Sequence, residues 1–151
     1  MAVEMREVTG AASLIEANEP LGREHYEEIA LNKTLMQYAP DIGRYRALEE
    51  LGLLACVAAF DNEVMVGYSV NIIVPHLHYM HLSTATNDMI FIAKSHRQGR
   101  TGLMLIKATR ELCKARGAQI MMWHAKQDTA LAKLLPRLGC RVQDIIFSED
   151  L

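Results

Sequence analysis

A chain of 151 residues, half of them hydrophobic, is long enough to bury a sizeable core, and we expect residues 1–151 to form a single domain. The net charge of −2 and the lack of any basic block argue against broad nucleic-acid binding, although a local basic groove is not excluded. No apolar run approaches the roughly 20 residues of a membrane-spanning helix. The N-terminus lacks an apolar signal core, and the odd cysteine count shows no metal-like spacing, so we predict a cytoplasmic protein without a membrane partner.

The first third of the chain, residues 9–51, reads as helical. Thr9 is predicted to cap a helix that continues to Asn18 and ends at Pro20, and residues 22–37 carry a weaker helical pattern. A proline and an aspartate at 40–41 then start a short helix that is closed by a glycine at 52.

The middle of the chain predicts a β-hairpin followed by a strand, a loop and a helix. Apolar residues 53–60, a polar turn at 61–63 and a second apolar stretch at 64–74 are typical of two antiparallel strands. A further strand is expected around residues 90–93. After a short loop, apolar residues recur at helical spacing from residue 105 until Gly117.

The last third predicts a strand, a helix and a final strand. Residues 118–124 are apolar, Asp128 is placed to cap a leucine-striped helix that ends at Gly139, and residues 141–147 read as a last strand. Helices first and a mixed sheet afterwards indicate an α/β (α+β) fold in three layers, with helices on both faces of the sheet.

Residues 90–106 are the most informative stretch because they predict a strand, a glycine-bearing loop and the start of a helix. Gly99 and Gly102 let the backbone approach a ligand, and the first helical turn presents free N–H groups to it. Arg97 and Arg100 add positive potential, so the junction favours a pyrophosphate. The dinucleotide fingerprint G-x-G-x-x-G and the P-loop G-x-x-x-x-G-K-[ST] are both absent.

The same loop resembles the acetyl-CoA loop of the GNAT N-acetyltransferases, whose pattern is [Q/R]-x-x-G-x-[G/A]. Arg97 and Gly102 match its first and last positions, whereas Arg100 stands where the middle glycine is usual and Gly99 comes one residue earlier. Val-Gly-Tyr at 66–68 and Leu-Gly-Cys-Arg at 138–141 resemble further elements of that family, so the resemblance covers about residues 52–142. The histidine-rich middle and the Arg-Gln-Gly-Arg loop look most like phage-encoded members.

This resemblance implies transfer of an acetyl group from acetyl-CoA to a primary amine, with acetyl-CoA as cosubstrate and no metal. It implies that the central strand offers backbone groups to the pantetheine and thioester at Phe91, Ile92 and Ala93. Pyrophosphate contact is implied for the loop residues Arg97, Gln98, Gly99, Arg100, Thr101 and Gly102. The resemblance leaves a homodimer open and does not identify the acceptor.

The proton-transfer groups depart from the family pattern, because Leu135 occupies the position of its usual tyrosine acid. His124, at the end of a predicted strand, is the best alternative acid or base, although it can equally be a histidine that contacts only solvent. Asp88 can accept a proton from the amine, or it can cap a turn together with Asn87.

Several histidines and tyrosines are candidates for the acceptor site. By resemblance, Tyr68, His76, His78 and Tyr79 line it, and residues 25–28 cover it. The His-x-His spacing could hold a metal, but we expect no metal site here. Three rivals remain: a non-catalytic acyl-CoA-binding protein, a phage-type enzyme that modifies nucleic acid, and a metal-binding module.

Overall fold

The computed structural model describes residues 2–151, and it is built around one five-stranded sheet in the order β1-β2-β3-β4-β5. Neighbouring strands are antiparallel except for the last pair, β4 and β5, which is parallel. The sheet is therefore mixed, as predicted. Its strands are β1 (Glu4–Val8), β2 (Leu54–Asp61), β3 (Val64–Pro75), β4 (Ser83–Ile92) and β5 (Ile120–Met122).

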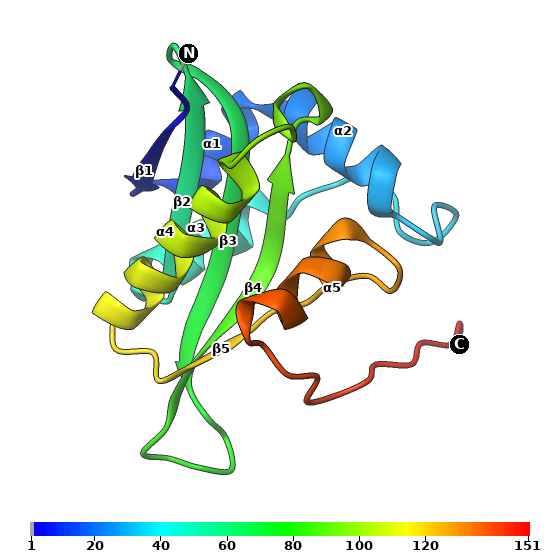
Figure 1. Cartoon of the computed structure of the whole chain (residues 1–151). Helices are drawn as coiled ribbons and strands as arrows, with labels where there is room; N and C mark the ends of the chain where they lie inside the picture. Colours follow the sequence, from blue (N-terminus) through cyan, green and yellow to red (C-terminus); the bar gives the residue numbers. More distant parts are fainter. Residues whose placement is uncertain (1) are drawn as a thin grey trace.

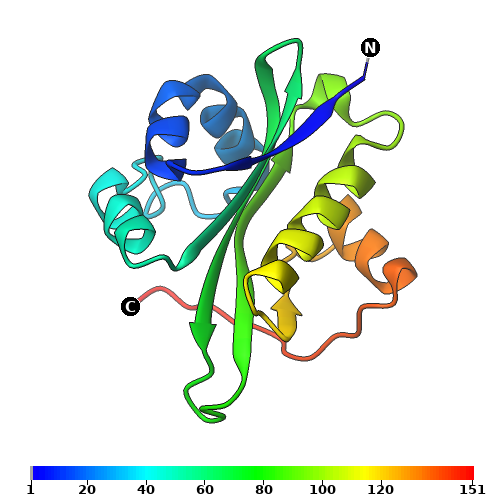
Figure 2. The same ribbon diagram turned by 90° about the vertical axis from the view of Figure 1, so that its left-hand side faces the viewer.

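Helices cover both faces of the sheet, which confirms the three-layer prediction (Figure 2). One face carries α1 (Ala11–Ala17), α2 (Glu19–Ile29) and α3 (Ile42–Glu50), and the other carries α4 (Thr101–Ala115) and the short α5 (Ala130–Leu134). Single 3-10 turns stand at Lys94–His96 and Leu135–Leu138. No helix within residues 2–151 combines the length and apolar character needed to cross a membrane.

Successive side chains of β2 point to opposite faces of the sheet, and both faces are covered by helices, so β2 contributes to the apolar core on each face. Cys56 and Ala58 pack with Phe91 under α1–α3, whereas Val57 packs with Leu105 under α4. Leu105 is fully buried, and truncation of such a leucine to alanine typically costs about 2–5 kcal/mol. The helix predicted after the loop is thus an anchor of the sheet.

The N-terminal third differs from the helical prediction. Glu4–Val8 forms strand β1, which pairs with β2 and had no counterpart in the prediction. Gly10 rather than Thr9 precedes the first helix, and Pro20 opens α2 instead of ending a helix, because a proline in the first turn sacrifices no helical hydrogen bond. The weak pattern at 22–37 is helical only as far as Ile29.

The C-terminal third also corrects two predictions. Thr129, whose hydroxyl accepts a hydrogen bond from the N–H of Ala132, caps α5, while Asp128 lies before it in the left-handed region at φ 64°. The predicted strand at 141–147 is wrong, since these residues are exposed and carry no regular structure. Consecutive apolar residues at 145–147 give no one-sided strand face. The Nδ2 of Asn32 lies 3.0 Å from both carboxylate oxygens of Asp150, so the end of the tail lies beside the segment that follows α2 and not in the sheet.

Candidate active site beside the open edge of β4

Strand β4 leaves its neighbour β5 halfway along its length. It pairs with β3 along its whole length, but β5 pairs with only Thr84–Thr86. Within residues 2–151, no strand pairs with the β5-facing edge of β4 from Asn87 to Ile92. The carbonyl of Ile92 accepts a hydrogen bond from Arg97, and the other backbone groups on this edge have no strand partner, so they can bind an extended ligand (Figure 1).

A β-bulge lies where the open edge begins. Val70 pairs with Met89 and Asn71 with Asn87, so Asp88 is the extra residue of β4. Asp88 is exposed, and its Oδ2 accepts a hydrogen bond of 2.8 Å from the hydroxyl of Tyr45 on α3. Burial, followed by the Asp88 charge, raises the pKa of Tyr45 well above its usual value, so the tyrosine stays a donor. The hydrogen bond therefore fixes the orientation of the Asp88 carboxylate.

The loop that leads into α4 forms a cradle of backbone donors. Among the described residues, the N–H groups of 98–103 have no acceptor, and the first bond of this region runs from Met104 N to Arg100 O. Gly99 has φ +90°, and a β-carbon added at Gly99 or Gly102 would meet nothing within 4 Å. Open space over unpaired donors at a helix N-terminus fits a pyrophosphate.

Arg97 lies on the side of this loop that faces α2. Its Nε donates to the carbonyl of Ile92 at 2.8 Å, and its two terminal nitrogens bond Glu28 at 2.8 and 2.6 Å. The guanidinium also lies 5.0 Å from the centre of the Phe91 ring. This pairing holds the pKa of Glu28 below its usual value. Direct contact between Arg97 and a pyrophosphate stays a prediction.

Two further contacts fix the segment before the loop. Glu24 accepts a bond of 3.0 Å from the N–H of Lys94, and the Nε2 of His96 lies 3.1 Å from Asp61. Glu24 and Glu28 are four residues apart and thus lie on one face of α2. This spacing is the sequence signal for the clasp, by which we mean the contacts of these two glutamates with Lys94 and Arg97. The pairing itself joins residues about 70 positions apart, and sequence reasoning did not find it.

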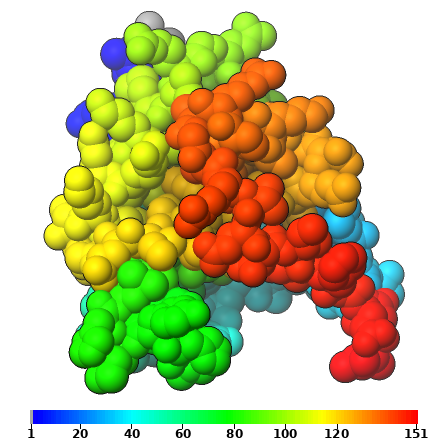
Figure 3. Space-filling model, turned by 60° about the horizontal axis from the view of Figure 1, so that its bottom comes forward, coloured from blue at the N-terminus to red at the C-terminus, as the bar shows by residue number. Residues whose placement is uncertain are grey.

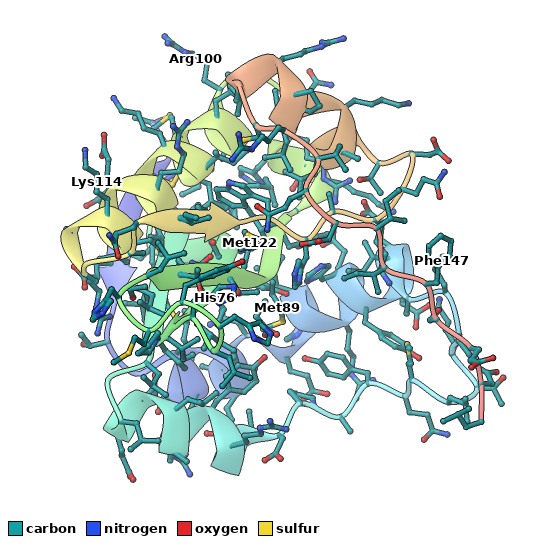
Figure 4. All side chains as sticks on the ribbon, turned by 90° about the horizontal axis from the view of Figure 1, so that it is seen from below. His76, Met89, Arg100, Lys114, Met122 and Phe147 are labelled. Atoms are coloured by element: carbon teal, nitrogen blue, oxygen red, sulfur yellow. The ribbon has the colours of Figure 1, made fainter. Side chains whose placement is uncertain are left out.

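The remaining predicted cofactor residues divide by exposure. Phe91, Ile92 and Ala93 are buried, so only their backbone can face a ligand. Gln98 and Arg100 are exposed in the loop, and Arg100 projects outward in Figure 4. Thr101, buried at 8 % exposure, is the first residue of α4.

Tyr68, predicted to contact the acceptor, lies in the core beneath α2. Its hydroxyl is 2.7 Å from Nδ1 of His25, whose ring stacks on Phe91 at 4.6 Å. Burial lowers the pKa of His25 to about 4 and raises that of Tyr68. His25 is therefore neutral near pH 7, and this pair joins α2 to β3 and β4.

His76 and Tyr79 line a hollow of about 330 Å³ on the far side of the sheet from α4. The hollow lies between the β3–β4 loop and the C-terminal tail, which project separately in Figure 3. Figure 4 shows His76 on the same side of the molecule as Met122, a further lining residue. His78 lies in the same loop, with its ring 5.8 Å from that of His76. Within residues 2–151, no cluster of side chains has the arrangement of a metal site.

The two catalytic candidates differ in their surroundings. Asp88 is fixed by Tyr45, whereas His124 is exposed just after β5 and contacts no described side chain by a hydrogen bond. Leu135 is buried at 7 % exposure, so no acid stands at that position.

Comparison with solved structures identifies the fold as that of N-acetyltransferases. An aminoglycoside acetyltransferase from an uncultured soil metagenomic sample superposes with a TM-score of 0.77 at 21 % identity, covering 100 % of this chain and 99 % of the other. Ribosomal-protein-alanine N-acetyltransferase from Brucella melitensis biovar Abortus gives 0.72 at 14 % identity, with 99 % of both chains covered. AAC(6')-Iy, in complex with a bisubstrate analogue of CoA, gives 0.66 at 19 % identity, covering 100 % and 99 %. No family model and no curated protein matches the sequence.

Proposed function

We propose that this chain is an acetyl-CoA-dependent N-acetyltransferase that acts on a primary amine. One observation carries the proposal: the unpaired N–H groups of 98–103 stand beside the open edge of β4, in a fold shared with acetyltransferases. The first feature suits a pyrophosphate, and the second suits the extended arm and thioester that follow it.

In this proposal the loop and the open edge hold acetyl-CoA. The N–H groups of 98–103 bind the pyrophosphate, Arg100 supplies positive potential, and Arg97 contributes less because Glu28 neutralises its charge. The backbone of Phe91, Ile92 and Ala93 borders the pantetheine. Acetyl-CoA supplies the thioester, whose C–S bond is exchanged for a C–N bond to the amine.

We assign Asp88 to the amine proton because its carboxylate is oriented beside the open edge. An ammonium drawn to Asp88 becomes a nucleophile once the carboxylate, directly or through water, takes its proton. With Leu135 in place of a tyrosine, the thiolate receives its proton from solvent or from His124. Protonation of the thiolate by His124 is part of the proposal, and the role of Asp88 as the base does not depend on it.

The acceptor extends from Asp88 into the hollow lined by His76 and Tyr79. Thr84 and Thr86 line that hollow from β4, and two residues along a strand place Thr86 about 7 Å from Asp88. Threonine hydroxyls and aromatic rings, together with the apolar side chains of Leu82, Ile120 and Met122, surround a volume of about 330 Å³, which suits a compact amine that carries hydroxyl groups and an apolar face. Three of the neighbouring structures, which represent two proteins, are named aminoglycoside acetyltransferases, and this agrees with an amine that carries hydroxyl groups. Tyr68 is bonded to His25 in the core and His78 lies in the β3–β4 loop, and contact of either residue with the acceptor stays a prediction.

The decisive experiment is calorimetric titration with acetyl-CoA. We expect binding by the wild type and loss of at least about tenfold in affinity for Gly102→Asp, whose carboxylate would enter the anion cradle. Gly43→Asp, on the exposed helix α3, is the matched control and should bind normally. Equal affinity of wild type and Gly102→Asp would place the ligand elsewhere.

Experiments on the same purified protein distinguish the rival functions. A non-catalytic binder would bind acetyl-CoA but acetylate no amine in a panel of amino sugars, polyamines and peptides. A nucleic-acid-modifying enzyme would use the basic hollow of about 870 Å³ lined by Lys107, Arg110 and Lys114. Lys114 lies about 20 Å along α4 from Thr101, so this hollow does not lead a nucleic acid to the loop.

The proposal also covers the compartment and the oligomeric state. The three cysteines are free thiols, which agrees with a reducing cytoplasm. A homodimer is the proposed assembly, which a measurement of mass in solution tests.

A further inference from the structure

A chain of buried polar side chains crosses the centre of the sheet beneath α4. Ser69, Asn71 and Asn87 are 0, 0 and 1 % exposed. Burying amides is unfavourable unless each finds hydrogen-bond partners, and an apolar residue would fill these positions more simply. The positions of their partners therefore indicate what these residues do.

The hydrogen bonds run across three strands. The Nδ2 of Asn87 donates to the carbonyl of Met89 at 3.0 Å and to Oδ1 of Asn71 at 2.9 Å. The Nδ2 of Asn71 donates in turn to the carbonyl of Ala55 on β2 at 2.9 Å and to Oγ of Ser69 at 3.1 Å. A continuous path of side-chain amides thus connects the backbone of β4 to the backbone of β2.

The path begins at the β-bulge. The bond from Asn87 to Met89 steps over Asp88, the extra residue that interrupts pairing with β3. A bulge leaves the ladder locally incomplete, and a shift of one residue would turn each following side chain of β4 to the other face. The Nδ2 of Asn87 meets its acceptors in the observed register, whereas its Oδ1 has no partner among the described residues, so Nδ2 is the group that opposes that shift.

We infer that Asn87, held by Asn71 and Ser69, is a positioning residue that fixes the bulge and, through it, Asp88 and the open edge of β4. The inference rests on the proposed function, since the bulge matters for acetyl transfer only if the open edge binds the thioester. The side chain of Asn87 is 1 % exposed and so is not open to a ligand. It acts through the backbone from Asp88 to Ile92.

Hydrogen–deuterium exchange on Asn87→Val tests this role directly. We expect exchange in the segment 88–92 to rise by about tenfold or more, while β2 and α4 stay within about threefold of the wild type. With any accepted amine, kcat should fall by roughly 10²-fold and KM for acetyl-CoA should stay within about threefold, because a displacement near 1 Å suffices for such a loss. Ser69→Ala, a milder change, should give the same local pattern at lower amplitude if Asn87→Val does not fold.

Thr109→Val is the matched control. Thr109 is fully buried on α4, and its hydroxyl has no hydrogen-bond partner among the described residues, so exchange and kcat should not change. Uniformly faster exchange in Asn87→Val, or local opening with an unaltered kcat, would overturn the positioning role. Failure of the wild type to bind acetyl-CoA would reject the proposed function instead, and the exchange pattern would still decide whether Asn87 fixes the bulge.

Discussion

Arg97→Ala should weaken the fold more than it weakens acetyl-CoA binding. The substitution removes a charge-assisted bond to the carbonyl of Ile92, a residue 9 % exposed, which is worth about 1.5–3 kcal/mol. The pair with Glu28 has side chains 38 and 29 % exposed, so screening limits it to about 0.5 kcal/mol, and the contact with Phe91 adds a similar amount. We expect a loss of about 2.5–4 kcal/mol, or roughly 5–16 °C in Tm for a domain of this size.

Urea unfolding and calorimetric titration of the same variants measure the two effects. Since Glu28 already neutralises Arg97, the affinity for acetyl-CoA should fall less than tenfold. Arg100→Ala is the control, because it removes an equal charge from an exposed side chain with no hydrogen bond to described residues. An Arg97→Ala protein with full stability and a 10- to 100-fold weaker affinity would refute this reasoning and make Arg97 a pyrophosphate ligand.

The pH dependence provides an internal check on the Arg97–Glu28 pair. Arg97 lowers the pKa of Glu28 from 4.5, so the pair stabilises the fold above that pH and loses its effect as the pH falls through the lowered value. The stability difference between wild type and Arg97→Ala should therefore shrink in acid. A difference that stays constant down to pH 3 would assign the whole loss to the bond with Ile92.

Three further predictions concern single groups. His25 has a pKa of about 4 in the folded protein, against an unperturbed value of 6.5, so the unfolded chain takes up the proton first. The free energy of unfolding should therefore fall by up to about 3 kcal/mol as the pH falls from 6.5 to 4. His25→Asn should flatten this pH dependence in urea titrations, and an unchanged slope would exclude His25 as its cause. Iodoacetamide at pH 8 should label Cys140 alone by mass spectrometry, since burial raises the pKa of Cys56 to about 12 and that of Cys113 to about 11; rapid double labelling would contradict this. Asp88→Asn should lower kcat by about 10²–10⁴-fold with unaltered acetyl-CoA affinity, and a normal kcat would leave the amine proton to solvent.

Strong periodicity explains which elements were predictable. The hairpin of β2 and β3 and the helix α4 carry long apolar patterns, and the structure places them as expected. Gly67 is a specific signal for close approach of β3 and β4, since a β-carbon at this position would lie 2.8 Å from the carbonyl oxygen of Phe91 on β4. Strand β1 was missed because its five residues alternate only weakly, and its pairing with β2 supplies the missing preference.

The site was predictable only where it is local in sequence. Gly99 and Gly102 mark the loop because glycines at a strand–helix junction carry a backbone meaning that a single sequence shows. The bulge at Asp88 depends on how β4 pairs with β3, and the clasp of Arg97 depends on a helix about 70 residues away. Neither leaves a periodic signal. Tertiary pairing created both.

An open strand edge inside a sheet is a liability, because unpaired N–H and C=O groups invite closure against a neighbour. Here β4 is held from both of its faces independently of β5. From the α2 side, Glu24 and Glu28 bind the segment that follows β4, and from the α4 side Asn87 fixes its bulge. The gap between β4 and β5 therefore does not rely on a ligand to stay open. This preorganisation is what acetyl transfer requires, since the reaction asks of the protein chiefly that thioester and amine be held in one geometry.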